Sequence, residues 1–449
     1  MRLPETPTSV PKLLQSIAAA RLAELIPSST RIWDEDKYLH WNELRRRPAP
    51  RGMTHEEWWL LLKLGRKAKF IPLKDENGQP FRFSTPDSLI AKLHEIDLGL
   101  GGSWSLPPAV TDPASRNEYV ISTLIEEAIT SSQLEGAVTT REVAKEMLRS
   151  GRKPRDKSER MILNNYQTMQ RIMELRESTL TPELVFELHR IVTVGTLDGE
   201  DAAGRVRHSD EIIRVTDEEG NVFHDPPPAG ELPSRMASMC LFANGGSPDY
   251  FIHPVIRAIL LHFWLAYDHP FVDGNGRTAR ALFYWSMLHQ GFELFEFISI
   301  SQILLKAPVQ YAMAFLHVET DDNDLTYFIL HQTAVIQDAV AALHDYVARK
   351  KASLQAAERR LRGIEGLNHR QQVLLTHALR EPNSRYTIEG HRRTHGVVYQ
   401  TARTDLLDLA KRGLLQKDKT KRALSFHPER DLTGKLDELA AAMERPRKT

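Results

Sequence analysis

The stretch at residues 269–280 reads His269-Pro-Phe-Val-Asp-Gly-Asn-Gly-Arg-Thr-Ala-Arg280. The helical pattern before it ends near Asp268, and a second helix is predicted to begin near Arg277. Gly274 and Gly276 lie between the two helices, where the backbone can bend and approach a ligand closely. Successive backbone N–H groups at the start of a helix attract an anion. The stretch therefore predicts a turn that binds phosphate.

The charged side chains of this stretch fit the same interpretation. Arg277 and Arg280 are three residues apart, so they share nearly one helix face and can hold two phosphate groups of a chain. Asp273 offers an oxygen ligand for Mg²⁺, and His269 can accept a proton from an attacking hydroxyl. Alone, a histidine beside an apolar helix is usually structural and a Gly-x-Gly is usually a turn. Together they predict a phosphate site with a base beside it.

The stretch resembles the signature of the Fic family, His-Pro-Phe-x-Asp-Gly-Asn-Gly-Arg-x-x-Arg, with every fixed position present. Upstream, His253-Pro precedes the helix that runs into His269, as it does in the family. Gly204-Arg-Val-Arg207, followed by a predicted hairpin over Ile212–His224 and by three prolines, resembles the Fic flap region. The resemblance covers residues 117–343, about half of the chain.

The resemblance implies a protein adenylyltransferase, which moves AMP from ATP to a Ser, Thr or Tyr hydroxyl of a target protein. His269 would remove the hydroxyl proton, and Phe271 would seat the loop by packing. Nucleotide and Mg²⁺ would be held by the residues that match the motif, which are Asp273, Gly274, Asn275, Gly276, Arg277 and Arg280. Among these, Asp273 would bind the metal, the two arginines would hold the β- and γ-phosphates, and the Asn275 side chain would help to cradle the phosphates.

A second motif, Ser131-Ser-Gln-Leu-Glu135-Gly136, lies at the end of the helix predicted from Asn117. From the residues alone it is a helix end with a glycine stop and an acid that is usually solvated. It resembles the inhibitory segment of Fic proteins, Ser/Thr-x-x-x-Glu-Gly. The resemblance implies that Glu135 pairs with Arg280 and occupies the place of the γ-phosphate.

Two alternative functions stay open beside an inhibited transferase. The same site could act in reverse and hydrolyse AMP from modified proteins, or the chain could be a DNA-binding regulator whose Fic core senses a nucleotide. An intact His269 argues against pure sensing, because a sensor needs the arginines but not the base. Leu305-Lys-Ala-Pro-Val-Gln-Tyr311 departs from the family pattern bordering the nucleoside, so UTP, GTP and CTP stay open beside the expected ATP.

The periodicity predicts a mainly α-helical chain with several regions. Residues 1–108 form a small Trp-rich α+β region, whose first helix is expected over Pro11–Leu25 and whose predicted role is packing. It ends in a loop, Gly99–Pro108. Residues 109–350 form the Fic core, which includes the inhibitory helix and a β-hairpin flap. A helical connector follows over residues 351–366.

Residues 367–430 are predicted to form a winged helix-turn-helix, because three helices are followed by a basic hairpin. Residues 431–449 are a tail. From Lys351 onward the chain has 21 Lys and Arg against 12 Asp and Glu, although the whole chain is neutral with 59 of each. The third helix and the hairpin carry the residues expected to meet DNA phosphates, namely Gln400, Arg403, Thr404, Lys411, Arg412, Lys417, Lys419, Lys421 and Arg422. Dimerisation, including a homodimer, or target docking is the alternative.

The bulk composition predicts a cytoplasmic protein. Cys240 is the one cysteine, so no disulfide can form within the chain. The first residues lack the apolar core of a signal peptide, and the apolar run from Val255 to Tyr267 is interrupted by Arg257 and His262. The expected partners are therefore a target protein and the chain itself as a substrate, with no membrane contact.

Overall fold

The computed structural model describes residues 3–27, 38–100, 113–216, 219–364, 366–382, 384–420 and 423–444. The chain divides into two compact units. The first combines Met1–Trp104 with Ile121–Ala341, and the second combines Ser105–Val120 with Ala342–Thr449. Among the described residues, no helix is both long enough and apolar enough to cross a bilayer.

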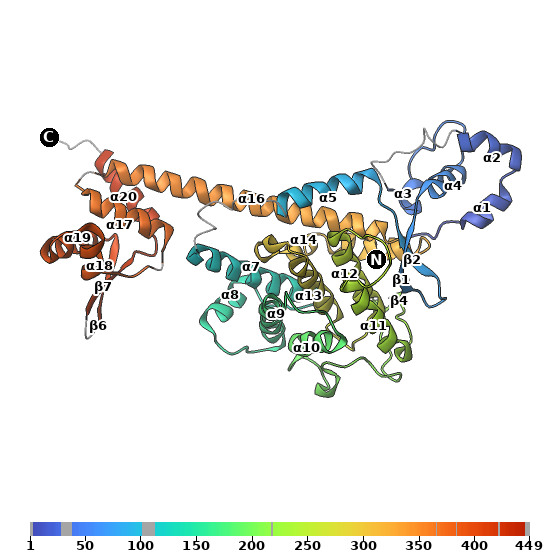
Figure 1. The fold of residues 1–449 in the computed structure, drawn as a ribbon, viewed down its shortest axis with the longest axis horizontal. Coiled ribbons are helices and arrows are strands. Elements are labelled where there is room, and N and C mark those ends of the chain that lie inside the picture. Colours follow the sequence, from blue (N-terminus) through green and yellow to red (C-terminus); the bar gives the residue numbers. More distant parts are fainter. Residues whose placement is uncertain are drawn as a thin grey trace. The chain divides into compact units, whose positions relative to one another are not determined.

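The first unit is mainly helical, as predicted (Figure 1). Its helices are α1 Val10–Ser16, α2 Ala19–Leu25, α3 Trp41–Leu44, α4 His55–Gly65, α5 Asp87–Leu100, most of α7 Pro113–Leu134, α8 Arg141–Ser150, α9 Lys157–Glu174, α10 Pro182–Thr193, α11 Leu232–Ala243, α12 Pro254–Asp268, α13 Asn275–His289, α14 Ile300–Leu304, α15 Pro308–Glu319 and the first part of α16 Thr326–Gly363. Two antiparallel pairs complete it, β1 Lys69–Lys74 with β2 Pro80–Phe83 and β3 Val215–Thr216 with β4 Val222–His224.

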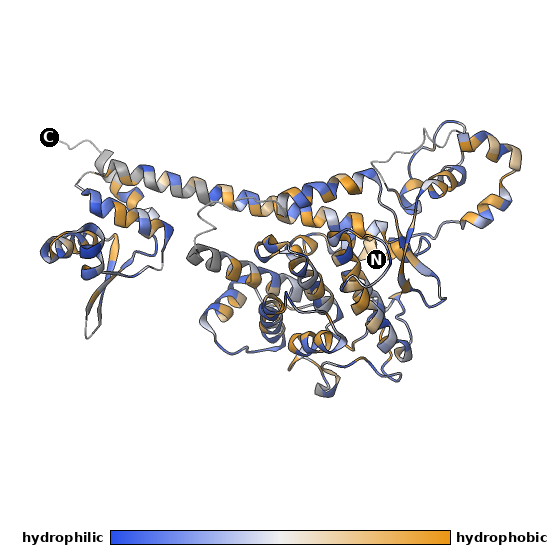
Figure 2. Cartoon of the chain, viewed as in Figure 1, coloured by the Kyte–Doolittle hydropathy of each residue, from blue (hydrophilic) through white to orange (hydrophobic). Residues whose placement is uncertain are grey.

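The core of this unit is built around α12 and α13, which are consecutive in the chain and pack side by side (Figure 1). Pro254 fits the first turn of α12, since that position needs no N–H donor. The side chain of His253 caps this helix by accepting from the N–H of Val255 at 3.3 Å. Apolar side chains surround both helices, and Trp264 and Trp285 are almost completely buried. Figure 2 shows apolar residues gathered on these helices. A rigid pair of helices therefore carries the loop that joins them.

The N-terminal region differs in detail from the prediction. The helix expected over Pro11–Leu25 is two helices, because Ile17 and Ala18 adopt extended backbone between α1 and α2. Both helices still pack on one cluster: Leu13 belongs to the cluster of Trp41 and Trp59, and Leu22 packs against it. Trp41, Trp58 and Trp59 are buried, in agreement with a packing role, whereas Trp33 lies outside the described residues. The loop predicted over Gly99–Pro108 is wrong at its start, because α5 continues to Leu100, and its remainder lies outside the described residues.

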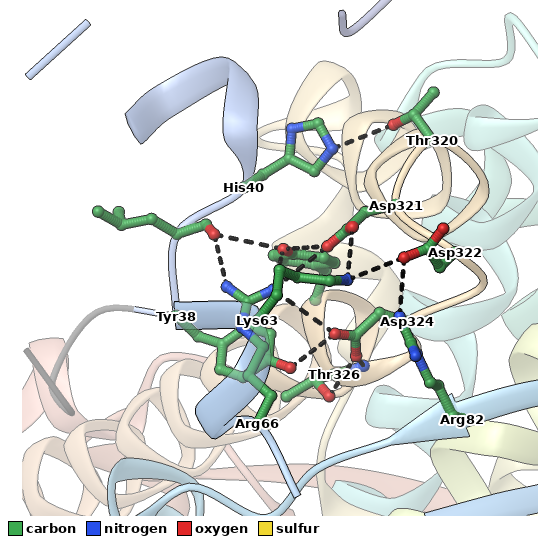
Figure 3. Close-up of polar contacts among 12 residues, drawn as sticks. Tyr38, His40, Lys63, Arg66, Arg82, Thr320, Asp321, Asp322, Asp324 and Thr326 are labelled. Atoms are coloured by element: carbon green, nitrogen blue, oxygen red, sulfur yellow. Dashed lines mark hydrogen bonds and ion pairs between the residues drawn. The ribbon is translucent and has the colours of Figure 1, made fainter. Parts of the chain in front are cut away.

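A buried ionic network holds this region against the turn before α16 (Figure 3). Asp321 lies 2.6 Å from Lys63 and 3.2 Å from Arg66, both from α4 and its end. The Tyr38 hydroxyl donates to Asp324 at 2.6 Å. Buried charges are tolerated when each is paired and hydrogen-bonded, so this network specifies where α4 docks. The N-terminal region is consequently part of the same compact unit as the helical core.

The second unit contains the end of α16 followed by α17 His369–Arg380, β5 Tyr386–Thr387, α18 Ile388–His395, α19 Tyr399–Lys411, β6 Leu415–Thr420, β7 Ala423–Pro428 and α20 Leu432–Glu444. Its sheet has the antiparallel order β5-β7-β6. Leu375, Leu406, Leu409 and Phe426 are completely buried in its core. The expected series of three helices and a hairpin is present. The segment expected to be a tail contains α20, whose Leu436 joins this core.

Candidate functional site

The loop between α12 and α13 has two residues in the left-handed backbone region. His269 ends α12 with a φ of 45°, and Gly274 precedes α13 with a φ of 81°. A Cβ atom at Gly274 would lie 2.7 Å from Cγ2 of Thr193 on α10, so both the backbone angle and the space require glycine. The loop therefore lies tightly against α10, and the first N–H groups of α13 are held in a fixed place.

The side chain of Asn275 braces this loop from within. Its amide oxygen accepts from the N–H of Phe271 at 2.9 Å, and its amide nitrogen donates to the Phe271 carbonyl at 2.8 Å. The sequence analysis assigned this amide to the phosphates. The Asn275 amide thus forms one hydrogen bond as a donor and one as an acceptor, both with the backbone of Phe271. These two bonds hold the shape of the loop.

His189 on α10 is a site residue that the sequence analysis missed. Its ring stacks on Phe271 with centroids 3.7 Å apart, and its Nε2 lies 2.9 Å from the Asp273 carbonyl. Its Nδ1 accepts from the N–H of Gly204 at 2.9 Å, which fixes Nε2–H as the donor to Asp273. Burial lowers the pKa of His189 to about 4, so the ring stays neutral. No local spacing reveals it, because its partners are 15 and 84 residues away.

His269 is arranged to act as a base. Its Nδ1 lies 3.2 Å from the Ala266 carbonyl, so Nδ1 carries the proton and Nε2 keeps a lone pair. Burial lowers the pKa of His269 to about 4, so the ring is neutral near neutral pH. Arg207 holds the adjoining backbone, since its N–H donates to the Pro270 carbonyl at 2.8 Å and its Nε to the His269 carbonyl at 3.2 Å. The predicted flap motif thus fixes the loop that bears the base.

Ser131, Glu135 and Arg280 meet in the structure. Oε1 of Glu135 lies 2.8 Å from Nη2 of Arg280, so the ion pair expected from the sequence is present. Nε of the buried Arg280 donates to the Ser131 hydroxyl at 2.8 Å, and its Nη2 donates to the Ser131 carbonyl at 2.9 Å. A Cβ atom at Gly276 would collide with the Glu135 carboxylate. This carboxylate therefore lies directly against the first turn of α13.

Gly136 follows α7 with a φ of 89°, in the left-handed backbone region that favours glycine. It therefore ends the segment that presents Glu135, as the motif predicts. Its backbone N–H donates to the Gln133 carbonyl at 3.1 Å, which closes the turn after the helix.

A second carboxylate on α7, Glu127, was also missed by the sequence analysis. It accepts from the Tyr284 hydroxyl at 2.9 Å, from the Ser299 hydroxyl at 2.8 Å, and from both the N–H and the hydroxyl of Ser301. Glu127, Ser131 and Glu135 are spaced by four residues, as are their neighbours Gly276, Arg280 and Tyr284 on α13. Equal spacing places each set on one helix face. We call these six residues the α7–α13 ladder.

Arg277 is a buried cation whose hydrogen bonds are incomplete. Its Nη1 donates to the Val192 carbonyl at 3.1 Å, and its Nη2 lies 3.5 Å from Oδ1 of Asp273. Its Nε has no hydrogen-bond partner among the described residues. Burial lowers the pKa of Arg277 from its ordinary value, because the buried guanidinium has lost most of its contact with water. Such a group strongly favours a bound anion.

Asp273 fits a metal ion that is shared with a ligand. Its side chain is 43% exposed, and its Oδ1 accepts from the Gly274 N–H at 2.5 Å. Within the described ranges no group of three or more His, Cys, Asp or Glu side chains could hold a metal by itself. Mg²⁺ commonly takes one or two protein carboxylates, with phosphate oxygens and water as its other ligands. A single exposed aspartate beside the phosphate turn meets that requirement.

One cavity of about 230 Å³ brings the predicted base and the ion pair together. His269, Glu135, Gly276 and Arg280 line it on one side. Its other walls are formed mainly by the flap strands and by α12 and α15, through Val215, Phe223, His224, Ala266, Tyr267, Tyr311, Ala312, Phe315, Leu316 and Glu319. The flap pairs Val215 with His224 and Thr216 with Val222, and is shorter than the predicted Ile212–His224 hairpin. Asp217 and Glu218 of its turn lie outside the described residues.

Comparison with known proteins agrees with this geometry. Residues 179–287 match the family described as Fic/DOC. The chain is 33% identical over 117 residues to a protein adenylyltransferase Fic of Nematostella vectensis, covering 26% of this chain and 25% of that protein. It is 39% identical over 69 residues to the protein adenylyltransferase Fic of Drosophila mojavensis, covering 15% and 14%. The chain thus spans a quarter or less of the length of these relatives.

A solved structure shares the fold. It is a Fic family protein from Desulfovibrio desulfuricans G20, which matches with a TM-score of 0.50 and 18% identity over 76% of this chain and 95% of its own. At that identity the likeness concerns the fold alone. The predicted fold class, a mainly helical core with a short β-hairpin at the site, is confirmed for the first unit.

Proposed function

We propose that this chain, whose residues 179–287 match the Fic/DOC family, transfers AMP from ATP to a hydroxyl of a target protein and that Glu135 inhibits the transfer. The observation that carries the proposal is the Glu135–Arg280 ion pair, which lines the same cavity as His269. A base, a buried arginine and a competing carboxylate thus share one site.

His269 supplies the proton chemistry. Nε2 of its neutral ring accepts the proton of the target hydroxyl, and the oxygen forms a bond to the α-phosphorus of ATP. The bond between that phosphorus and the bridging oxygen breaks, and pyrophosphate leaves with the electron pair. A low pKa for His269 keeps the base unprotonated and ready near neutral pH.

The start of α13 supplies the phosphate site. The first turn of α13, which begins beside the closely packed Gly274, is a helix N-terminus that attracts an anion, and Arg277 offers donors that no described residue satisfies. Arg280 is the second guanidinium, assigned to the γ-phosphate. Mg²⁺, held by Asp273, would neutralise phosphate charge when it is bound.

Glu135 inhibits because it takes the donors that the terminal phosphate needs. It uses Nη2 of Arg280 and lies against Gly276, so an ATP terminal phosphate and this carboxylate compete for one place. Two like charges there repel strongly in a partly buried site. Transfer therefore requires the end of α7 to move, and a target or another signal would cause that movement.

The flap is the part of the site to which a target segment would bind. β3 and β4 border the cavity beside His269, and an extended target segment could pair with their backbone. The chain itself is one such target, which makes self-modification a convenient readout. Removal of AMP from a modified protein is the second candidate, and the position of Glu135 in the same cavity as His269 favours it, because a carboxylate there could hold a water molecule.

The proposal is tested by self-modification with Mg²⁺ and α-labelled ATP, UTP, GTP or CTP. We expect little label on the wild type, strong label on Glu135→Gly with ATP, and none on Glu135→Gly/His269→Ala. Gln133→Gly places the same residue at the end of α7, but away from Arg280, and should stay weakly labelled. Label that survives in the double variant would contradict the role of His269. An absence of label with every nucleotide, combined with release of AMP from a modified substrate, would favour the hydrolase.

A further inference from the structure

The second unit carries a basic, solvent-facing surface on α18 and α19, and we propose that this surface binds duplex DNA in its major groove. The two helices are joined by Gly396, Val397 and Val398, and Gly396 has a φ of 63° that allows the tight turn. Two helices with a short turn, the second one exposed, are the arrangement that places a helix in the major groove.

The two faces of α19 are clearly divided. Ala402, Leu406 and Leu409 are completely buried in the core of the unit. At the start of the helix, Val398 and Tyr399 are exposed, at 69% and 52%. The face opposite the core carries four exposed polar or basic side chains, those of Gln400, Arg403, Thr404 and Lys411, with the partly buried Leu407 between them. This face is therefore free to meet a partner over three helical turns.

Buried Asp405 fixes that face in position. It accepts from Asn368 at 2.7 Å, from Nε of Arg370 at 2.7 Å and from Nε2 of His391 at 3.2 Å. These partners come from the cap and first turn of α17 and from α18, so α19 is tied to both neighbouring helices. Side chains that contact a binding partner are positioned most precisely when they project from such a rigid element.

The charge of the surface suits a polyanion. Arg403 forms no ion pair within the described part of the chain, and Arg392 and Arg393 share the single carboxylate of Glu389. Lys417 on β6 is exposed, whereas Lys421 and Arg422, expected at the tip of the hairpin, lie outside the described residues. The surplus of arginine would release counterions from DNA phosphates on binding.

The residue types favour duplex DNA over double-stranded RNA. Arg contacts guanine and Gln contacts adenine in the major groove, so Arg403 and Gln400, three residues apart on one face of α19, form a pair of candidate base contacts. A-form RNA has a deep, narrow major groove that a helix cannot enter.

The test uses the full-length protein and fluorescence anisotropy with labelled duplexes. A 30-bp duplex of random sequence, at about 50 mM salt, should bind, and its affinity should fall steeply as salt rises. Selection from a randomised library should then recover a preferred site. Arg403→Ala should weaken binding to that site by about 10-fold or more and relax one base position. Arg430→Ala, an exposed arginine outside the two helices, is the matched control and should bind as the wild type does.

Three results would overturn the proposal: no duplex binding at low salt, equal loss with Arg430→Ala, or tighter binding of single-stranded RNA than of duplex DNA. A shift to monomer on Val398→Asp without any DNA binding would identify the surface as a protein interface instead. Because Glu135→Gly and His269→Ala lie in the other unit, both should bind DNA normally, so this proposal and the proposed transferase can fail separately.

Discussion

Two carboxylates, Glu127 on α7 and Glu135 directly after its last residue, have opposite surroundings. Glu127 is 2% exposed and accepts four hydrogen bonds from Tyr284, Ser299 and Ser301. The side chain of Glu135, eight residues later, is 27% exposed, and Arg280 is its one side-chain partner in the described part of the chain. The residue type is the same, so the number of donors and the access of water decide what each carboxylate does.

This difference gives the two carboxylates different roles, and we call Glu127 the anchor and Glu135 the latch. A buried charge that loses its partners is costly, so Glu127 holds the middle of α7 against α13 and α14. A partly exposed ion pair is screened by water and exchanges its partner at little cost, so Glu135 can yield Arg280 to a phosphate. Release of the proposed inhibition should therefore move the end of α7 and leave its middle in place.

The largest expected effect is on stability. Glu127→Gln should lower the free energy of unfolding by about 3 kcal/mol, because an amide group would face hydroxyl and N–H donors that need an acceptor. Glu135→Gln should lower it by only about 1 kcal/mol, as expected for a partly exposed pair. Urea unfolding followed by tryptophan fluorescence measures this in the first unit, since all seven tryptophans precede residue 286. Equal losses in the two variants would remove the distinction between anchor and latch.

The second prediction concerns activity. Glu135→Gly should raise the rate of self-modification by roughly 10- to 100-fold, the range of a coupling between two states of 1–3 kcal/mol. Glu127→Gln should raise it less than threefold at a temperature where the protein stays folded, because the latch remains. Initial rates with α-labelled ATP give the comparison. If loosening the anchor activates as strongly as removing the latch, then α7 leaves α13 as a whole.

The pH dependence sharpens the same comparison. Burial lowers the pKa of His269 to about 4, while the charge of Glu135 acts in the opposite direction and raises it. The base works when it is neutral, so activity should be constant above about pH 6 and fall as pH drops through that pKa. Removing Glu135 removes a negative charge that favours the protonated ring, so the acid limb of kcat/KM in Glu135→Gly should lie at lower pH than in Gln133→Gly. Glu127→Gln should leave that limb unmoved.

Much of the fold and the site could be predicted from the sequence, because the motif over residues 269–280 is contiguous. It placed His269, Asp273 and the arginines, and helical periodicity located α9, α10 and α13 within a few residues. The inhibitory motif gave the partner of Arg280 in advance. The roles assigned to these residues stay predictions, as does the winged-helix interpretation of the second unit.

The site residues that could not be predicted from the sequence have partners that are distant along the chain. Glu127 looks like any acid on an amphipathic helix, since its donors are 157 to 174 residues away. The same is true of His189 and its contact with Asp273. The role of Asn275 at the phosphates stays a prediction, and its motif position did not reveal that its amide also hydrogen-bonds to the backbone of Phe271 within the loop. The break after α1 could not be predicted, because neither glycine nor proline occurs at that position.

The smallest expected effect tests the residue between anchor and latch. Ser131→Ala removes the hydroxyl that accepts from Nε of Arg280 at 2.8 Å but keeps the backbone carbonyl that accepts from Nη2. Losing one hydrogen bond to a cation while another remains should raise the rate of self-modification by about two- to fivefold. Ser132→Ala is the matched control, because the Ser132 hydroxyl is buried and has no hydrogen-bond partner among the described residues. If Ser131→Ala activates as strongly as Glu135→Gly, then the position of Arg280, and not the charge of Glu135, maintains the inhibited state.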